Sequence, residues 1–204
     1  MTPLVIAHRG SSWDVPENTL PAFERAIADG ADFVELDVHA RPTGELVVTH
    51  DPPRPEDDLP SLEEALDLIH GRIGVMVELK TPHRYRRHRV VERTLDLLTE
   101  DDVFVCFEPG AVALVRRLRP ELRTVQHTQY VPIRLAARRG CWAAGFWDRH
   151  ASPRALARAQ RLGLETMVYT VNDPARMRGL AALAVSGIFT DRPALARQVL
   201  RAEG

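Results

Sequence analysis

Short apolar segments alternate with amphipathic segments along this chain, and this alternation constrains its fold more than any other feature. The apolar segments are rich in Val, Ile and Phe, and the segments between them carry apolar residues at helical spacing. The predicted strands are Leu4–His8, Asp32–Asp37, Val75–Lys80, Val103–Phe107, Thr124–Thr128, Trp142–Phe146, Thr166–Val171 and Gly187–Thr190. Strands that alternate with helices pair in parallel through right-handed crossovers. Eight such units predict an α/β fold, a compact (β/α)8 TIM barrel, although a doubly wound open sheet fits the same alternation.

One segment interrupts this pattern after the second strand. Glu45–His50 follows too closely for a crossover helix, and Pro42-Thr43-Gly44 is typical of a turn. We therefore predict a small β-hairpin of Val34–His39 and Glu45–His50 that stands off the barrel. The proline-rich segment Pro52–Pro60 is then an irregular loop.

Composition limits the class of protein. The chain has 204 residues, 45% of them hydrophobic, which suits a single domain over 1–204. Its 27 basic and 28 acidic side chains give a net charge of -1, which argues against a nucleic-acid partner. The chain lacks the roughly 20-residue apolar run that spans a membrane. No signal-peptide pattern follows Met1, and Cys106 and Cys141 lie in apolar segments, so we expect a cytoplasmic protein with buried thiols.

Ionisable residues gather where the predicted strands end. Residues two apart on a strand point to the same side, so Glu35 lies beside Asp37 and Glu78 beside Lys80. In a barrel of this kind the carboxyl ends of the strands form the active face. The same face receives His8-Arg9 from the first strand and His50-Asp51 from the hairpin.

These residue types indicate phosphoester cleavage. Three carboxylates without cysteine suit a hard divalent cation, Mg²⁺ or Ca²⁺. Arg9 and Lys80, the only lysine of the chain, suit a phosphate. His8 and His50 can donate and accept protons near neutral pH.

Several motifs in this order resemble the glycerophosphodiester phosphodiesterases. They are His8-Arg9-Gly10, Pro16-Glu17-Asn18-Thr19, Glu35-Leu36-Asp37-Val38, His50-Asp51, Glu78-Leu79-Lys80, Val171-Asn172-Asp173 and Thr190-Asp191-Arg192-Pro193. The resemblance implies a metal-dependent TIM-barrel enzyme that hydrolyses a small-molecule glycerophosphodiester to glycerol 3-phosphate and an alcohol. It implies that Glu35, Asp37 and Glu78 hold the metal, that His8 and His50 form the acid–base pair, and that Arg9 and Lys80 bind the phosphate. Glu17 and Asn18 would brace the loop that carries Arg9.

The chain also departs from the family pattern at the expected barrel mouth. Pro52–Pro60 is shorter than the usual family insertion, which removes part of the substrate rim. Tyr169 stands where the family commonly has a tryptophan, and Cys106-Phe107-Glu108 replaces a commoner Ser-Phe-Asp. Phe107 and Tyr169 either line the substrate pocket or pack the top of the barrel.

Two other functions fit the same residues. One is a phospholipase D-like phosphodiesterase acting on lysophospholipids or sphingolipids, and the other is a non-catalytic phosphate-binding barrel. Both water and the glycerol 2-hydroxyl are suitable nucleophiles, and either histidine can be the acid. The oligomeric state stays open. His39 falls on the predicted hairpin and is a weaker candidate for the site. The remaining histidines lack a supporting motif and are interpreted as surface or packing residues; they are His70, His83, His88, His127 and His150.

Overall fold

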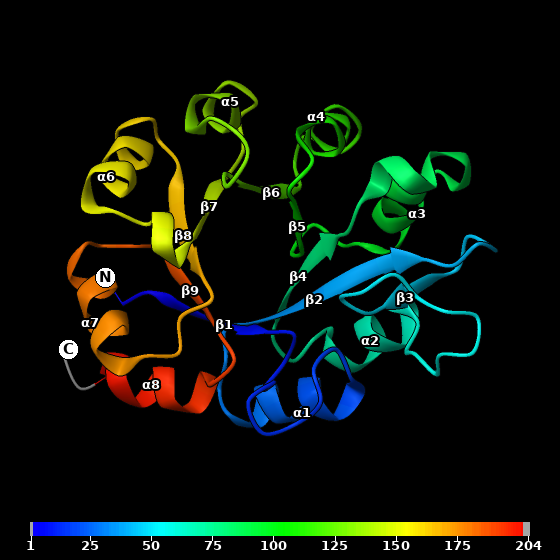
Figure 1. Cartoon of the computed structure of the whole chain (residues 1–204), viewed down its shortest axis with the longest axis horizontal. Helices are drawn as coiled ribbons and strands as arrows, with labels where there is room; N and C mark the ends of the chain where they lie inside the picture. Colours follow the sequence, from blue (N-terminus) through cyan, green and yellow to red (C-terminus); the bar gives the residue numbers. More distant parts are fainter. Residues whose placement is uncertain (1, 202–204) are drawn as a thin grey trace.

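A closed barrel of eight parallel strands lies inside a ring of helices in the computed structural model, which describes residues 2–201 (Figure 1). The barrel strands are β1 (Leu4–His8), β2 (Phe33–Ala40), β4 (Gly74–Leu79), β5 (Val103–Cys106), β6 (Arg123–His127), β7 (Ala143–Trp147), β8 (Glu165–Tyr169) and β9 (Gly187–Thr190). Strand β1 pairs in parallel with both β9 and β2, which closes the sheet. The predicted (β/α)8 barrel is therefore confirmed, and the open-sheet alternative is excluded.

Helices follow the strands in the predicted alternation. They are α1 (Leu20–Ala28), α2 (Leu62–Ile69), α3 (Val90–Leu97), α4 (Pro109–Leu118), α5 (Ile133–Arg138), α6 (Pro153–Arg161), α7 (Pro174–Ala182) and α8 (Pro193–Arg201), with short 3-10 helices η1 (Pro82–His88) and η2 (Asp148–His150). Several begin at a side chain that accepts a backbone N–H: Thr19, Ser61, Ser152 and Asp173. Within residues 2–201, no helix combines the length and hydropathy that crossing a membrane requires.

The predicted hairpin forms at the end of β2. Strand β3 (Leu46–Val48) pairs antiparallel with β2, with Val38 opposite Val48. The amino-terminal part of β2 pairs with β1 inside the barrel, so this one strand serves both the barrel and the hairpin. Residues 52–60 form an irregular loop, as predicted.

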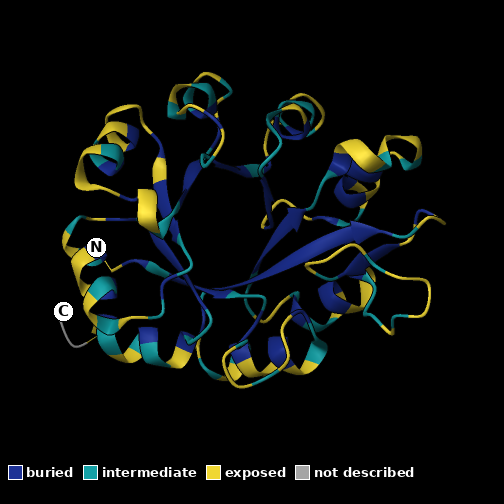
Figure 2. Ribbon diagram, in the orientation of Figure 1, coloured by how far each residue is buried: buried dark blue, intermediate teal, exposed yellow. Residues whose placement is uncertain are grey.

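Successive side chains of each barrel strand point to opposite faces of the sheet, and this gives two separate apolar cores. One set of side chains packs between the strands and the helices, and a smaller set fills the barrel interior. Figure 2 shows the resulting pattern, with buried strands inside helices that are exposed on their outer faces. The interior positions change from apolar to polar toward the carboxyl ends of the strands: Ile6 precedes His8, Phe33 precedes Glu35 and Asp37, Met76 precedes Glu78, and Val125 precedes His127. An apolar plug therefore supports a polar layer at the mouth.

A glycine fixes the loop that leaves β1 toward this mouth. Gly10 has φ +85°, and a Cβ built there would lie 2.7 Å from backbone atoms of Ala22 in α1. The amide of Ser11 donates to the carbonyl of Ala22, which draws the loop onto the helix. Only glycine allows both this conformation and this approach.

We predict that Gly10→Ala lowers the free energy of unfolding by about 1–3 kcal/mol, because the new methyl group meets backbone that cannot yield. Gly110→Ala is the matched control, since Gly110 lies in α4 and a Cβ there meets nothing within 4 Å. The control should be neutral or stabilising by up to about 1 kcal/mol. Chemical denaturation measures both, and equal stabilities for the two variants would contradict the account of Gly10.

Candidate active site

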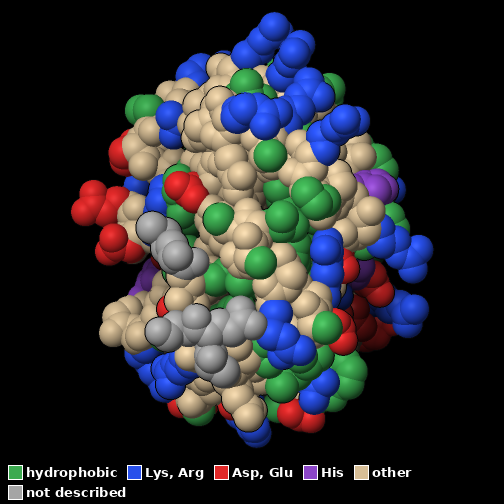
Figure 3. Space-filling view, turned by 90° about the vertical axis from the view of Figure 1, so that its left-hand side faces the viewer, with side chains coloured by type: hydrophobic (Ala, Val, Ile, Leu, Met, Phe, Trp, Pro, Cys, Tyr) green, Lys and Arg blue, Asp and Glu red, His purple; other side chains and the backbone are tan. Residues whose placement is uncertain are grey.

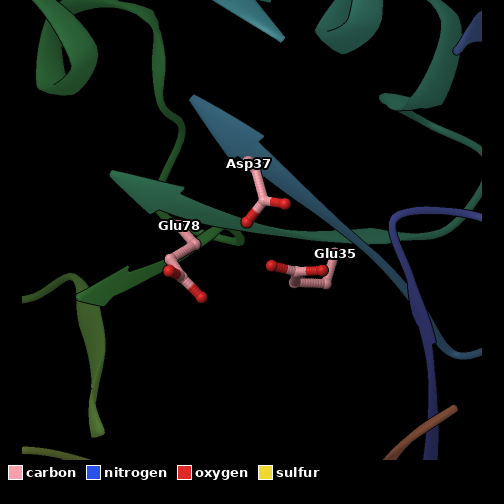
Figure 4. Close-up of side chains that lie close together, drawn as sticks. All are labelled: Glu35, Asp37 and Glu78. Atoms are coloured by element: carbon pink, nitrogen blue, oxygen red, sulfur yellow. The ribbon is translucent and has the colours of Figure 1, made fainter. Parts of the chain in front are cut away.

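Three carboxylates point toward one another at the carboxyl ends of β2 and β4 (Figure 4). Glu35 and Asp37 come from β2 and Glu78 from β4, and one ligand oxygen of each lies within 4.8 Å of the other two. All three are buried. The two-residue spacing on β2 brings both of its acids to the interior, as the sequence predicts.

Two cations contact these carboxylates. Lys80 Nζ lies 2.8 Å from Asp37 Oδ1 and also pairs with Glu78, while Arg9 Nε lies 2.9 Å from Asp37 Oδ2. Burial would lower the pKa of Lys80, but the charges of Glu78, Asp37 and Glu35 raise it, so the ammonium stays charged. Three carboxylates against two cations leave one excess negative charge. Burial and the charges of Asp37 and Glu78 accordingly raise the pKa of Glu35 well above its usual range.

The carboxylate cluster, Glu35, Asp37 and Glu78, fits a divalent cation. Asp37 Oδ1 and Glu78 Oε1 are buried and share the Lys80 ammonium between them. An oxygen-only donor set with excess negative charge is what Mg²⁺ and Ca²⁺ prefer. A cation held there would remove the electrostatic cost that raises the pKa of Glu35.

Each predicted catalytic histidine has a carboxylate on its Nδ1. His8 Nδ1 lies 2.7 Å from Asp191 Oδ1, and His50 Nδ1 lies 2.9 Å from Asp51 Oδ1. Burial opposes ionisation of Asp191, but hydrogen bonds with His8, Asn172 and Ser12 lower its pKa. These contacts leave Nε2 of both rings for other partners.

Both histidines line a cavity of about 330 Å³ at the barrel mouth. Its lining residues are His8, Arg9, His50, Glu78, Lys80, Phe107, Gln129, Trp147, Tyr169 and Thr170. Phe107 and Tyr169, left between two roles by the sequence, therefore both face the cavity. Burial and the nearby charge of Glu78 raise the pKa of Tyr169, so it remains a neutral phenol. Glu17 lies outside this lining and accepts from Arg9 Nη1 at 2.8 Å, which holds the guanidinium in place.

Comparison with known families identifies this arrangement. A family model described as the glycerophosphoryl diester phosphodiesterase family matches residues 8–69 and 52–195 of the chain. The chain belongs to this family. It is an enzyme, a phosphoric diester hydrolase, and the resemblance of its motifs is confirmed.

Several relatives match this phosphodiesterase over nearly their whole length. A glycerophosphodiester phosphodiesterase of Bacillus altitudinis is 28% identical over 93% of the chain and 94% of its own length. A crystal structure of the Agrobacterium tumefaciens enzyme is 27% identical, with a TM-score of 0.76 over 97% of this chain and all of that one. An Oleispira antarctica phosphodiesterase, in complex with the product sn-glycerol-3-phosphate, has the same fold at 21% identity, with a TM-score of 0.88 over 98% of this chain and 97% of that one.

His127 contacts the carboxylate cluster, which the sequence analysis did not predict. Its interpretation as a packing residue is correct, because its buried ring packs between Phe107 and Tyr169, but its Nε2 also lies 3.3 Å from Glu78 Oε2. Gly145 makes room for it, because a Cβ there would lie 2.2 Å from His127 Nδ1. Its position at the carboxyl end of β6, like that of His8 on β1, is a signal that could have found it.

Two further polar residues support the site from positions outside the cavity lining. Asn18 is buried, donates from Nδ2 to Asp37 Oδ2 at 3.0 Å and accepts the Asp37 amide, so it orients a carboxylate of the cluster. His39, the weaker site candidate on the predicted hairpin, does not line the cavity. Its Nε2 contacts the His50 carbonyl at 3.1 Å, which ties the hairpin to the loop that carries His50.

We predict that Glu35→Gln raises the free energy of unfolding of the metal-free protein by about 1 kcal/mol, or roughly 2–4 °C in Tm, because it removes the excess buried charge. The pKa of Glu35 is higher in the folded than in the unfolded state, so the metal-free wild type should lose stability as pH rises through that interval. The free energy of unfolding of Glu35→Gln should not fall with pH over this interval.

Thermal unfolding with and without Mg²⁺ completes the test. The wild type should gain stability when Mg²⁺ is added, and Glu35→Gln should gain little. A variant that is less stable without metal, yet equally stabilised by Mg²⁺, would contradict the role given to Glu35.

Proposed function

We propose that this phosphodiesterase hydrolyses glycerophosphodiesters to glycerol 3-phosphate and an alcohol, with a divalent cation in the carboxylate cluster and histidine acid–base catalysis. The observation that carries the proposal is a single cavity that joins a cluster acid, two cations and two histidines. Glu78, Arg9, Lys80, His8 and His50 all line it. These residues can stabilise the negative charge that develops on the phosphate, and they can transfer the protons that its hydrolysis requires.

Arg9 and Lys80 would bind the phosphate and offset the negative charge that develops on its oxygens. Glu17 supports this role by holding the Arg9 side chain. A divalent cation bound by Glu35, Asp37 and Glu78 would supply Lewis-acid stabilisation of that charge. Asn18 and His127 would keep two of these carboxylates oriented.

His8 and His50 would move the protons. One ring takes the proton of the nucleophile, water or the glycerol 2-hydroxyl, and the other protonates the leaving alkoxide. Asp191 holds Nδ1 of His8 and thereby leaves Nε2 for the cavity. Asp191 is a positioning residue, so Asp191→Asn should cost less activity than His8→Ala.

Release of glycerol 3-phosphate tests the proposal. Glycerophosphocholine, glycerophosphoethanolamine and a lysophospholipid are supplied with Mg²⁺ or Ca²⁺ after chelation. We expect metal-dependent release of glycerol 3-phosphate from the first two. Hydrolysis of the lysophospholipid would release its alcohol and leave lysophosphatidic acid, so it is followed by the alcohol. Release of the alcohol from the lysophospholipid alone would favour the lipid phosphodiesterase, and binding without turnover of any diester would favour a non-catalytic barrel.

We predict that His8→Ala and His50→Ala each lower kcat about 10²–10⁴-fold, the usual contribution of a positioned acid or base. The double variant should lose much less than the product of the two effects, because both residues act in the same reaction. Steady-state kinetics at saturating metal measures this. Near wild-type turnover in either single variant would remove that residue from the mechanism.

We also predict weak discrimination between alcohols. No residue of the short loop 52–60 lines the cavity, so contacts concentrate on the phosphate half of the substrate. Values of kcat/KM should fall within roughly tenfold across choline, ethanolamine and glycerol diesters. A preference beyond a hundredfold would show that another residue, such as Trp147 or Tyr169, reads the alcohol.

We further propose a cytoplasmic location. Its support is the pair of free, buried thiols of Cys106 and Cys141. Unpaired cysteines are typical of reducing compartments.

A further inference from the structure

One side of the barrel mouth carries a concentration of exposed arginines, here called the basic rim. They lie on η1, on η2 and near the starts of α5 and α6, all of which follow carboxyl ends of barrel strands. The basic rim consists of Arg84, Arg86, Arg87, Arg134, Arg149 and Arg154. Among residues 2–201, none of these six guanidinium groups has a carboxylate partner within 4.0 Å.

Three acids near the basic rim already have partners. Glu92 pairs with Arg89, Glu108 with His83 and Asp148 with Arg176. Figure 3 views the ring from the side and shows Lys and Arg side chains gathered at the top of that face, over the α5 and α6 part of the ring, whose helices carry arginines in their last turns as well as near their starts. The rim therefore presents a net positive field to solvent.

The opposite side of the mouth has the opposite charge. Exposed acids lie on the loop after β1 and on the loop after β3: Asp14, Glu17, Asp51, Glu56 and Asp58. Glu17 is paired with Arg9, but the other four acids outnumber the exposed Arg54 of these loops, so the mouth of a molecule with a net charge of -1 is polarised. On an anionic surface the molecule would therefore tilt, so that the basic rim contacts the surface and the acidic loops point away from it.

An exposed aromatic side chain accompanies the arginines. Tyr130, on the loop between β6 and α5, is 78% exposed. Its ring centroid lies 6.3 Å from that of Phe107, and Lys80 Nζ lies 5.9 Å from the same Phe107 ring. Tyrosine favours the level of lipid headgroups, where its ring and hydroxyl are both accommodated.

We propose that the basic rim docks on an anionic lipid surface, with Tyr130 at headgroup level and the cavity opening beside the membrane. The arginines are spread over separate loops around a rim, which suits a flat surface better than the groove of a duplex. The contact extends the proposed function toward substrates held in a membrane. The docking requires no chemical step, so binding can be measured without hydrolysis.

Sedimentation with vesicles tests the docking. The full chain is mixed with vesicles of phosphatidylcholine, with or without 40% phosphatidylglycerol, at low ionic strength. The rim variant carries Arg86→Gln, Arg87→Gln and Arg134→Gln. The control carries Arg117→Gln, Arg161→Gln and Arg201→Gln, which remove the same charge from exposed positions in the last turns of α4, α6 and α8, at the other end of the barrel.

We expect binding to the anionic vesicles only, and its loss as salt screens the charges. The rim variant should bind at least about tenfold more weakly, while the control should stay within about twofold of wild type. Equal losses in both variants, or no binding at low salt, would overturn the proposal. Tighter binding to duplex DNA with the same sensitivity to the rim variant would also overturn it. Hydrolysis of soluble glycerophosphocholine by both variants separates failure to dock from failure of the proposed activity.

Discussion

Three buried carboxylates share one space at the barrel mouth, and the rest of the site is organised around their charge. Glu35, Asp37 and Glu78 could not be brought together in an apolar interior without compensation. Lys80 and Arg9 offset part of the negative charge of the three carboxylates. The negative charge that remains contributes to the raised pKa of Glu35. A protein that keeps such a cluster gives up stability for a site that a divalent cation can fill, and the apolar interior below it supplies the rigidity that this needs.

The polar side chains at the barrel mouth are oriented by contacts with neighbouring side chains. Asn18 and His127 orient two of the carboxylates, and Glu17 holds Arg9. Asp191, which directly follows the last strand, contacts His8, so residues 183 positions apart in sequence meet at the site. Closure of the barrel between β1 and β9 is what brings them together. The fold therefore contributes to the chemistry through the relative placement of strand ends.

Local patterns were sufficient to predict most of the fold and the core of the site. Apolar alternation located all eight barrel strands, and the two-residue spacing of Glu35 with Asp37 and of Glu78 with Lys80 predicted which side chains meet. The contact of His127 with the carboxylate cluster was missed because the only signal of this histidine is a place at a strand end, and its partner Glu78 lies on a strand that is not adjacent in the sheet. The basic rim was missed for another reason. The net charge averages over the whole chain, and only the fold shows that the arginines and the acids lie on opposite sides of the mouth.

The central claim is that the carboxylate cluster holds a divalent cation in direct contact with all three acids. Anomalous diffraction from crystals soaked in Mn²⁺ tests it most directly, since manganese accepts the same oxygen ligands and can be located by its own signal. The account predicts one strong peak bonded to oxygens of Glu35, Asp37 and Glu78, with the Lys80 ammonium no longer bridging Asp37 and Glu78. An absent peak, or one elsewhere on the molecule with the Lys80 contacts unchanged, would contradict it.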